Sequence, residues 1–129
     1  MKTSFTISDT FPTTPDVLYA AWLDSEVHAA MTEGGEAVID AALGTYFSAW
    51  DGYISGKNLE LEPERRIVQS WRTSDFQEND ADSKVEILLT PVPKGTKLTL
   101  IHTEIPAGQP DYEEGWEDFY FKPMHSYFK

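Results

Sequence analysis

The side chains able to exchange protons near neutral pH are three histidines, His28, His102 and His125. They form neither an i,i+4 pair nor a His-x-His motif, and a metal site needs at least three converging ligands. We therefore expect no metal and no cofactor. His102 shares one face of an expected strand with Leu98 and Leu100, where a histidine next to a cavity could act as an acid or a base. The sequence favours the alternative, a histidine held by hydrogen bonds in a structural role.

A second candidate base is Asp40, a carboxylate within the apolar run of residues 38–42. Asp40 facing a closed cavity would be a candidate general base, but strand alternation favours a position on the solvent face. No serine lies in a Gly-x-Ser-x-Gly motif. We therefore predict that the chain is not an enzyme.

Aromatic residues make up 13% of the chain, and several large ones fall on elements that we expect to face each other. They either line an apolar cavity, where indole N–H and tyrosine hydroxyl groups orient a small ligand, or fill the same space as core. The sequence leaves both interpretations open. The candidate ligand-binding residues are Trp22, Phe47, Trp50, Trp71, His102 and Trp116.

The net charge is strongly negative, because 10 Lys and Arg residues face 22 Asp and Glu residues, which gives −12. Nucleic acids and anionic membranes are bound through Lys and Arg contacts, so we expect neither as a partner. Arg65, Arg66 and Arg72, with Lys57, form the one basic grouping. It is either an anion or acidic-partner site or a sheet rim that balances the acidic surplus, and we favour the rim.

The chain contains no cysteine, which excludes disulfides and thiolate metal sites and fits a reducing compartment. Its first residues alternate polar and apolar side chains, unlike a signal peptide. No apolar run approaches the roughly 20 residues that span a bilayer. We expect a cytoplasmic protein.

The elements that must position these residues form one domain, residues 1–129. Period-two alternation predicts a strand over 2–11, and Thr14-Pro15-Asp16 predicts the start of the first of two short helices that end near Thr32. Alternation and turn signals then predict six more strands, at 36–43, 45–50, 53–62, 66–73, 84–92 and 96–105. Asp51-Gly52 is a strong hairpin signal, since a type I′ turn requires positive φ at both central residues.

A closing helix is predicted from Asp111 onwards, with an aromatic stripe that includes Trp116. Pro123 lies inside this stretch, where proline removes a backbone hydrogen bond and clashes with the preceding turn. We expect a kink near residues 119–123 and Trp116 buried against the sheet.

Several segments together carry a family resemblance over the whole chain. They are Gly44-Thr45-Tyr46-Phe47, residues 51–61 (DGYISGKNLEL), residues 66–72 (RIVQSWR), Ile105-Pro106 and residues 115–124 (GWEDFYFKPM). In this order they resemble the family named for the C-terminal domain of the activator of the heat-shock protein 90 ATPase. That family lies within the START and birch-pollen-allergen superfamily. The one local departure is Gly44-Thr45, where relatives usually carry a glycine pair.

The resemblance implies an α+β helix-grip fold, in which a curved antiparallel sheet of about seven strands holds a long C-terminal helix. It implies a non-catalytic domain that binds a small apolar or amphipathic molecule between sheet and helix, and a stress-related role. One alternative is a co-chaperone-like domain that binds a chaperone partner. The other is a cyclase- or hydrolase-like enzyme, of the kind that some members of the superfamily are, which would use the cavity with His102, Asp40 and tyrosines. In the eukaryotic co-chaperone a separate N-terminal domain does much of the work, so the family name does not by itself predict the activity of these residues.

Overall fold

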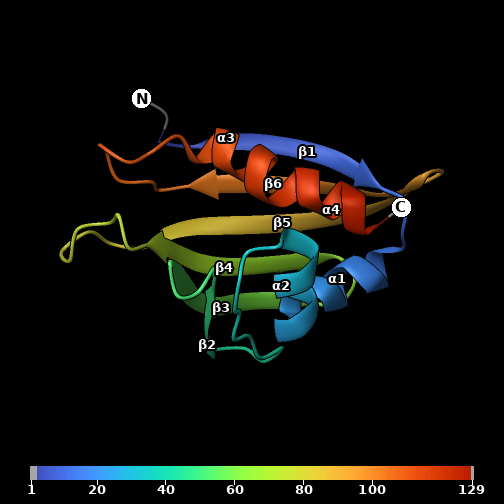
Figure 1. The fold of residues 1–129 in the computed structure, drawn as a ribbon, viewed down its shortest axis with the longest axis horizontal. Coiled ribbons are helices and arrows are strands. Elements are labelled where there is room, and N and C mark those ends of the chain that lie inside the picture. The colour runs from blue at the N-terminus through green and yellow to red at the C-terminus, as the bar shows by residue number, and fades with distance from the viewer. Residues whose placement is uncertain (1–2, 129) are drawn as a thin grey trace.

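The computed structural model describes residues 3–128, which form one six-stranded antiparallel sheet with helices on one of its faces (Figure 1). The strand order is β1-β6-β5-β4-β3-β2. The elements in chain order are β1 (Phe5–Phe11), α1 (Pro15–Leu23), α2 (Ser25–Thr32), β2 (Tyr46–Ala49), β3 (Ile54–Glu62), β4 (Arg66–Thr73), β5 (Ser83–Val92), β6 (Gly95–Thr103), α3 (Tyr112–Trp116), the π-helical turn η1 (Glu117–Phe121) and α4 (Lys122–Tyr127). The α+β helix-grip fold predicted from the sequence is confirmed.

The core lies between the sheet and the helices, and the alternation of the strands produces it. In β5, Val85, Ile87 and Leu89 are buried while the residues between them are partly exposed. Leu100 of β6 pairs with Ile87 on one side and with Ile7 of β1 on the other, so three neighbouring strands present apolar side chains to the same layer. Burying each such side chain stabilises the fold by about 1.5–3 kcal/mol.

The segment 36–43 is not a strand, so the sheet has six strands rather than about seven. Its one ladder contact is an isolated bridge between Val38 and Ser48. Side chains from elsewhere satisfy its backbone instead: Ser25 Oγ binds both the N–H and the carbonyl of Ile39, and Asn58 Nδ2 donates to the carbonyl of Asp40 at 2.8 Å. These side-chain bonds replace the hydrogen bonds of a regular ladder.

The predicted hairpin joins β2 to β3, and its left-handed residues begin one position earlier than expected. Trp50, Asp51 and Gly52 have φ of 56°, 56° and 90°. Gly52 N–H donates to the carbonyl of Ala49 at 3.2 Å and closes the turn. A bulky residue at positive φ is uncommon, so Trp50 is held in a conformation that its own side chain disfavours.

The C-terminal helical segment departs from α geometry just before Pro123. The Lys122 N–H donates to the carbonyl of Glu117, which is the five-residue spacing of a π-turn. The predicted interruption of the helix near residues 119–123 therefore takes the form of the π-turn η1. Trp116, at the end of α3, is 3% exposed, as predicted.

Candidate functional site

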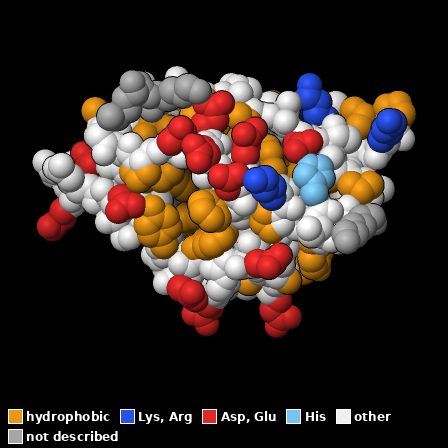
Figure 2. Space-filling model, turned by 45° about the horizontal axis from the view of Figure 1, so that its top comes forward, with side chains coloured by type: hydrophobic (Ala, Val, Ile, Leu, Met, Phe, Trp, Pro, Cys, Tyr) orange, Lys and Arg blue, Asp and Glu red, His pale blue; other side chains and the backbone are white. Residues whose placement is uncertain are grey.

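A cavity of about 300 Å³ lies between the first half of the C-terminal helical segment and the β2–β3 end of the sheet. Its surface is almost entirely apolar. Figure 2 shows hydrophobic side chains gathered around a hollow on this face of the molecule. The lining residues are Trp50, Tyr53, Ile54, Trp71, Pro110, Asp111, Tyr112, Gly115, Trp116, Phe119 and Tyr120.

The helical wall of the cavity follows from a spacing of four residues. Tyr112, Trp116 and Tyr120 lie on one face, and the ring centroids of Trp116 and Tyr120 are 4.6 Å apart. The sheet wall includes Trp71 of β4, whose ring lies 4.9 Å from that of Tyr112 and 5.5 Å from that of Trp116. Such aromatic pairs stabilise each other beyond the area that they bury, so these contacts favour the observed arrangement of the wall.

Trp50 forms the side of the cavity next to the hairpin. Its ring meets Phe119 edge-on at 5.7 Å and lies 6.3 Å from Tyr120. Gly34 packs against the back of the indole so closely that a Cβ there would overlap it. The Trp50 Nε1 atom is buried and has no hydrogen-bond partner within residues 3–128. Trp50 also interacts with the Tyr120 hydroxyl and lowers its pKa, against the larger and opposite effect of burial.

The tyrosine hydroxyls at the mouth are already hydrogen-bonded. The Tyr112 hydroxyl donates to Gln109 Oε1 at 2.7 Å and lies 2.7 Å from Thr73 Oγ1, and the Tyr53 hydroxyl donates to Asp75. Burial raises the pKa of Tyr112, and burial with the hydrogen bond to Asp75 raises that of Tyr53. Both hydroxyls stay protonated at neutral pH and hold the mouth in shape.

His102 lies behind Trp116 and does not line the cavity. Trp116 Nε1–H donates to His102 Nδ1 at 3.1 Å. His102 Nε2 lies 2.8 Å from Ser83 Oγ, which itself donates to the carbonyl of Trp71, so Nε2 carries the proton. Burial lowers the pKa of His102 to about 3. The imidazole is a neutral link between helix and sheet, which is the structural role that the sequence favoured.

Trp22 and Phe47 also lie in the core rather than in the wall. Trp22 is 3% exposed, stacks on Trp116 at 6.1 Å and donates its indole N–H to Gln69 Oε1. Phe47 is 6% exposed and packs against Gly56 of the neighbouring strand. Of the six candidate residues, the structure brings Trp50, Trp71 and Trp116 together at the cavity.

Five further large side chains in the wall were not among the candidates: Tyr53, Ile54, Tyr112, Phe119 and Tyr120. The helical spacing from Trp116 would have identified Tyr112 and Tyr120. Tyr53 and Ile54 enter the wall because the hairpin turns there, which no local periodicity signals.

The groups that acid–base chemistry would need do not converge at the cavity. Asp40 is exposed on the segment between α2 and β2, whereas His102 is completely buried behind Trp116. Nowhere in the described part of the chain do three His, Asp or Glu side chains come together in a metal-binding group. Within the same residues, no helix is both long and apolar enough to cross a membrane.

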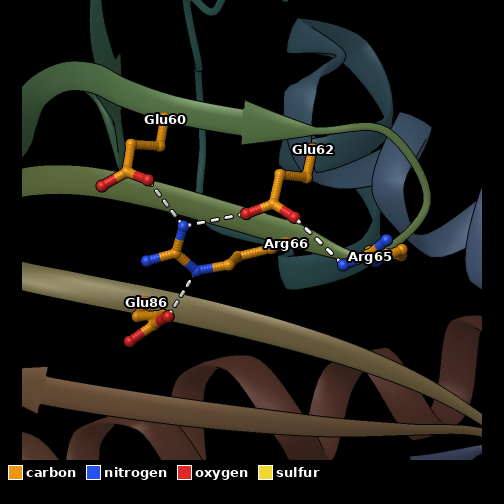
Figure 3. A network of polar contacts seen from close by, with 5 residues as sticks. All are labelled: Glu60, Glu62, Arg65, Arg66 and Glu86. Carbon is orange, nitrogen blue, oxygen red and sulfur yellow. Dashed lines mark hydrogen bonds and ion pairs between the residues drawn. The ribbon is translucent and has the colours of Figure 1, made fainter.

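The three arginines of the basic grouping pair with carboxylates of the chain itself, and Figure 3 shows these contacts for Arg65 and Arg66. Lys57 lies over the ring of Tyr46 instead. Arg66 binds Glu60, Glu62 and Glu86 from β3 and β5, and these hydrogen bonds raise its pKa. Arg72 binds Asp82 at 2.7 Å and the carbonyl of Gln77 at 2.9 Å, which anchors the acidic loop after β4. The arrangement is that of a sheet rim balancing acidic charge.

Fold and cavity together define a class, a helix-grip domain with an apolar cavity between its sheet and its C-terminal helix. The model of the family described as "Activator of Hsp90 ATPase homolog 1-like protein" matches residues 12–129, and the chain belongs to this family. It is 32% identical over 126 residues to the activator of 90 kDa heat shock protein ATPase homolog 1 of Homo sapiens. That match covers 95% of this chain and 36% of the human protein, so the chain spans about a third of its relative's length.

Solved structures share the fold over nearly the whole chain. An HSP90 activator from Plasmodium falciparum superposes with a TM-score of 0.87 at 27% identity, covering 98% of this chain and 96% of that one. A protein from Chromobacterium violaceum superposes with a TM-score of 0.79 at 25% identity, covering 99% and 98%. The predicted family resemblance is confirmed.

Proposed function

We propose that this domain is a non-catalytic binding module that holds one small apolar or amphipathic molecule in the cavity between β3, β4 and the C-terminal helical segment. The observation that carries the proposal is the cavity itself, with its volume of about 300 Å³ and its aromatic walls. This volume is at the lower end of the range for ligand pockets, which suits a molecule of one or two fused rings.

Gly115 supports this function because nothing in the fold explains a glycine at that position. It lies within α3, where glycine costs about 1 kcal/mol relative to alanine. A Cβ added there would meet no atom within 4 Å, so no close packing requires its absence. Gly115 lines the cavity, and the missing side chain leaves space at the wall.

Trp50 supports the same function through its unsatisfied donor. A buried N–H group without a partner lowers the stability of the folded protein. The backbone of Trp50 also has an unfavourable positive φ. The carboxylate of Asp51 accepts from Glu36 N–H at 2.8 Å, and Asp51 N–H donates to the carbonyl of Glu36 at 3.0 Å. These bonds hold the turn that carries Trp50. A small rotation of the indole would bring Nε1 to the cavity surface, where a ligand with an oxygen or nitrogen acceptor would satisfy the donor.

Native mass spectrometry of freshly purified protein, followed by a thermal-shift screen of small apolar molecules, tests the proposal. A molecule that binds only the folded state raises the melting temperature as its concentration exceeds Kd. Failure of every compound to stabilise the protein saturably would contradict the proposal.

The donor role of Trp50 is tested with 1-tetralone and tetralin, two probes that differ by one carbonyl group. Trp50→Phe keeps an aromatic ring and removes the N–H group. We expect it to weaken tetralone binding more than tetralin binding, and the difference isolates the hydrogen bond. Equal losses for the two probes would show that Trp50 contributes surface only.

The second candidate function is a co-chaperone-like interaction with an Hsp90, and the names of the relatives favour it. The human relative is named as an activator of the 90 kDa heat shock protein ATPase, and the Plasmodium falciparum structure as an HSP90 activator. Titration of this chain against a purified Hsp90, with the rate of ATP hydrolysis measured in parallel, tests binding and activation separately. Gly115→Leu, which fills the cavity, shows whether binding to the chaperone depends on it.

A further inference from the structure

The C-terminal helical segment, which forms one wall of the cavity, is acidic. Figure 2 shows Asp and Glu side chains close to the hydrophobic hollow on this face. Residues 111–128 contain a single Lys or Arg, Lys122, and it pairs with Asp118 at 3.2 Å. The acidic residues of the segment are Asp111, Glu113, Glu114, Glu117 and Asp118.

Asp111 brings this charge into the cavity wall itself. It lines the cavity as the N-cap of α3, and its side chain accepts from Glu114 N–H at 3.2 Å. Neither Asp111 nor Glu117 belongs to an ion pair among residues 3–128. Asp111 is exposed, so its carboxylate acts on a charge at the mouth of the cavity, within the Debye length of about 8–10 Å at physiological salt.

The aromatic lining also favours a positively charged ligand. Seven of the eleven lining residues are aromatic, and three of these are tryptophans. The face of an aromatic ring is electronegative, and an ammonium group within about 6 Å of the ring centroid is attracted to it, most strongly by Trp.

We infer that the cavity selects organic cations, molecules with a flat apolar body that enters between the aromatic walls and an ammonium group that stays at the mouth near Asp111. The inference rests on the proposed function and specifies its ligand class. The net charge of −12 acts in the same direction, because it concentrates cations near the whole domain and repels carboxylates and phosphates.

Three probes with the same ring system and different charge test the inference by isothermal titration calorimetry: 2-naphthylmethylammonium, neutral 2-naphthylmethanol and anionic 2-naphthoate. We expect the ammonium probe to bind about three- to tenfold more tightly than the alcohol, and naphthoate to bind most weakly. Raising the salt concentration should reduce the advantage of the ammonium probe and leave alcohol binding nearly unchanged.

The variant Asp111→Asn locates the effect, because asparagine keeps the N-cap acceptor and loses the charge. The control is Asp16→Asn, which makes the same change of charge on α1, at a residue outside the cavity lining. Asp111→Asn should weaken the ammonium probe several-fold and leave the alcohol unaffected, whereas Asp16→Asn should change neither appreciably.

The outcomes separate this inference from the proposed function. Equal affinities for the ammonium and alcohol probes, or equal effects of the two Asn variants on the ammonium probe, overturn the selection of cations and leave the binding cavity standing. Absence of binding by all three probes, together with a thermal-shift screen in which no compound stabilises the protein, overturns both.

Discussion

Gly115 offers the sharpest test of the cavity, because substitutions there change the cavity with little effect on the packing around it. Replacing it with alanine removes the helical cost of glycine, which stabilises the protein by about 1 kcal/mol. Replacing it with leucine adds a side chain that extends into the apolar space of about 300 Å³. Half-burial of the leucine side chain adds about another 1 kcal/mol to the free energy of unfolding.

The expected order of stability is therefore Gly115→Leu above Gly115→Ala above the natural sequence. Urea denaturation measures it directly, and a gain of 1 kcal/mol raises the melting temperature by about 3–5 °C in a chain of this size. Binding should follow a different order: Gly115→Ala keeps most of the affinity for an apolar probe, and Gly115→Leu abolishes it. Gain of stability with loss of binding is typical of a residue kept for function.

Two results would refute this reasoning. A Leu variant less stable than the natural protein would mean that the space beside Gly115 is closed, since a side chain forced into packed atoms destabilises. Unchanged probe affinity in the Leu variant would mean that the ligand binds elsewhere. The Ala variant controls for changes in helix propensity in both measurements.

The remaining predictions concern the walls, the acid response and the surface. Trp116→Ala should cost about 3–5 kcal/mol in urea denaturation, because it removes a buried indole that packs on both helix and sheet. Gly34→Ala should displace Trp50, destabilise the protein by about 1–3 kcal/mol and shift the tryptophan fluorescence. An unchanged fluorescence spectrum would contradict the close packing of Gly34 against Trp50. The pKa of His28 is lowered to about 4 and that of His102 to about 3, chiefly by burial. The unfolded chain therefore binds protons first, so stability should fall as pH drops from 6.5 towards 4, by up to about 1.4 kcal/mol per pH unit for each histidine. A urea midpoint that stays constant between pH 6.5 and pH 4 would contradict this prediction. A labelled oligonucleotide should show no binding in fluorescence polarisation at physiological salt, and micromolar, salt-sensitive binding would overturn that expectation.

The sequence predicted most of the fold because the strands obey simple alternation. Val85, Ile87 and Leu89 are buried at every second position of β5, and such a pattern specifies both the strand and its inner face. The segment 36–43 shows a similar local pattern but does not form a strand. Its backbone is held by Ser25 and Asn58, which are distant in sequence, so no local window could reveal it.

The site was predicted only in part, because lining a cavity and filling a core require the same residue types. Trp22 and Trp116 stack on each other, yet only Trp116 reaches the cavity. Tyr46 and Phe47 are neighbours in β2, and alternation places Tyr46 outside at 78% exposure and Phe47 in the core. The packing of the helix against the sheet decides which aromatic rings border the cavity. This packing is a tertiary property that no local sequence pattern reveals.

The two buried histidines explain how an aromatic wall can be rigid before any ligand binds. His102 accepts from the Trp116 indole at 3.1 Å, and the Tyr120 hydroxyl lies 2.7 Å from His28 Nε2. His28 Nδ1–H donates a hydrogen bond to the carbonyl of Trp22 at 2.9 Å, which leaves Nε2 as the acceptor for the Tyr120 hydroxyl. Each imidazole thus ties one ring of the helical wall to a different part of the core, and both do so in the neutral form that burial enforces. Rings fixed in this way lose little conformational entropy when a ligand enters, so more of the contact energy appears as affinity. His102, a candidate acid or base in the sequence, thus joins His28 in holding the wall against which binding occurs.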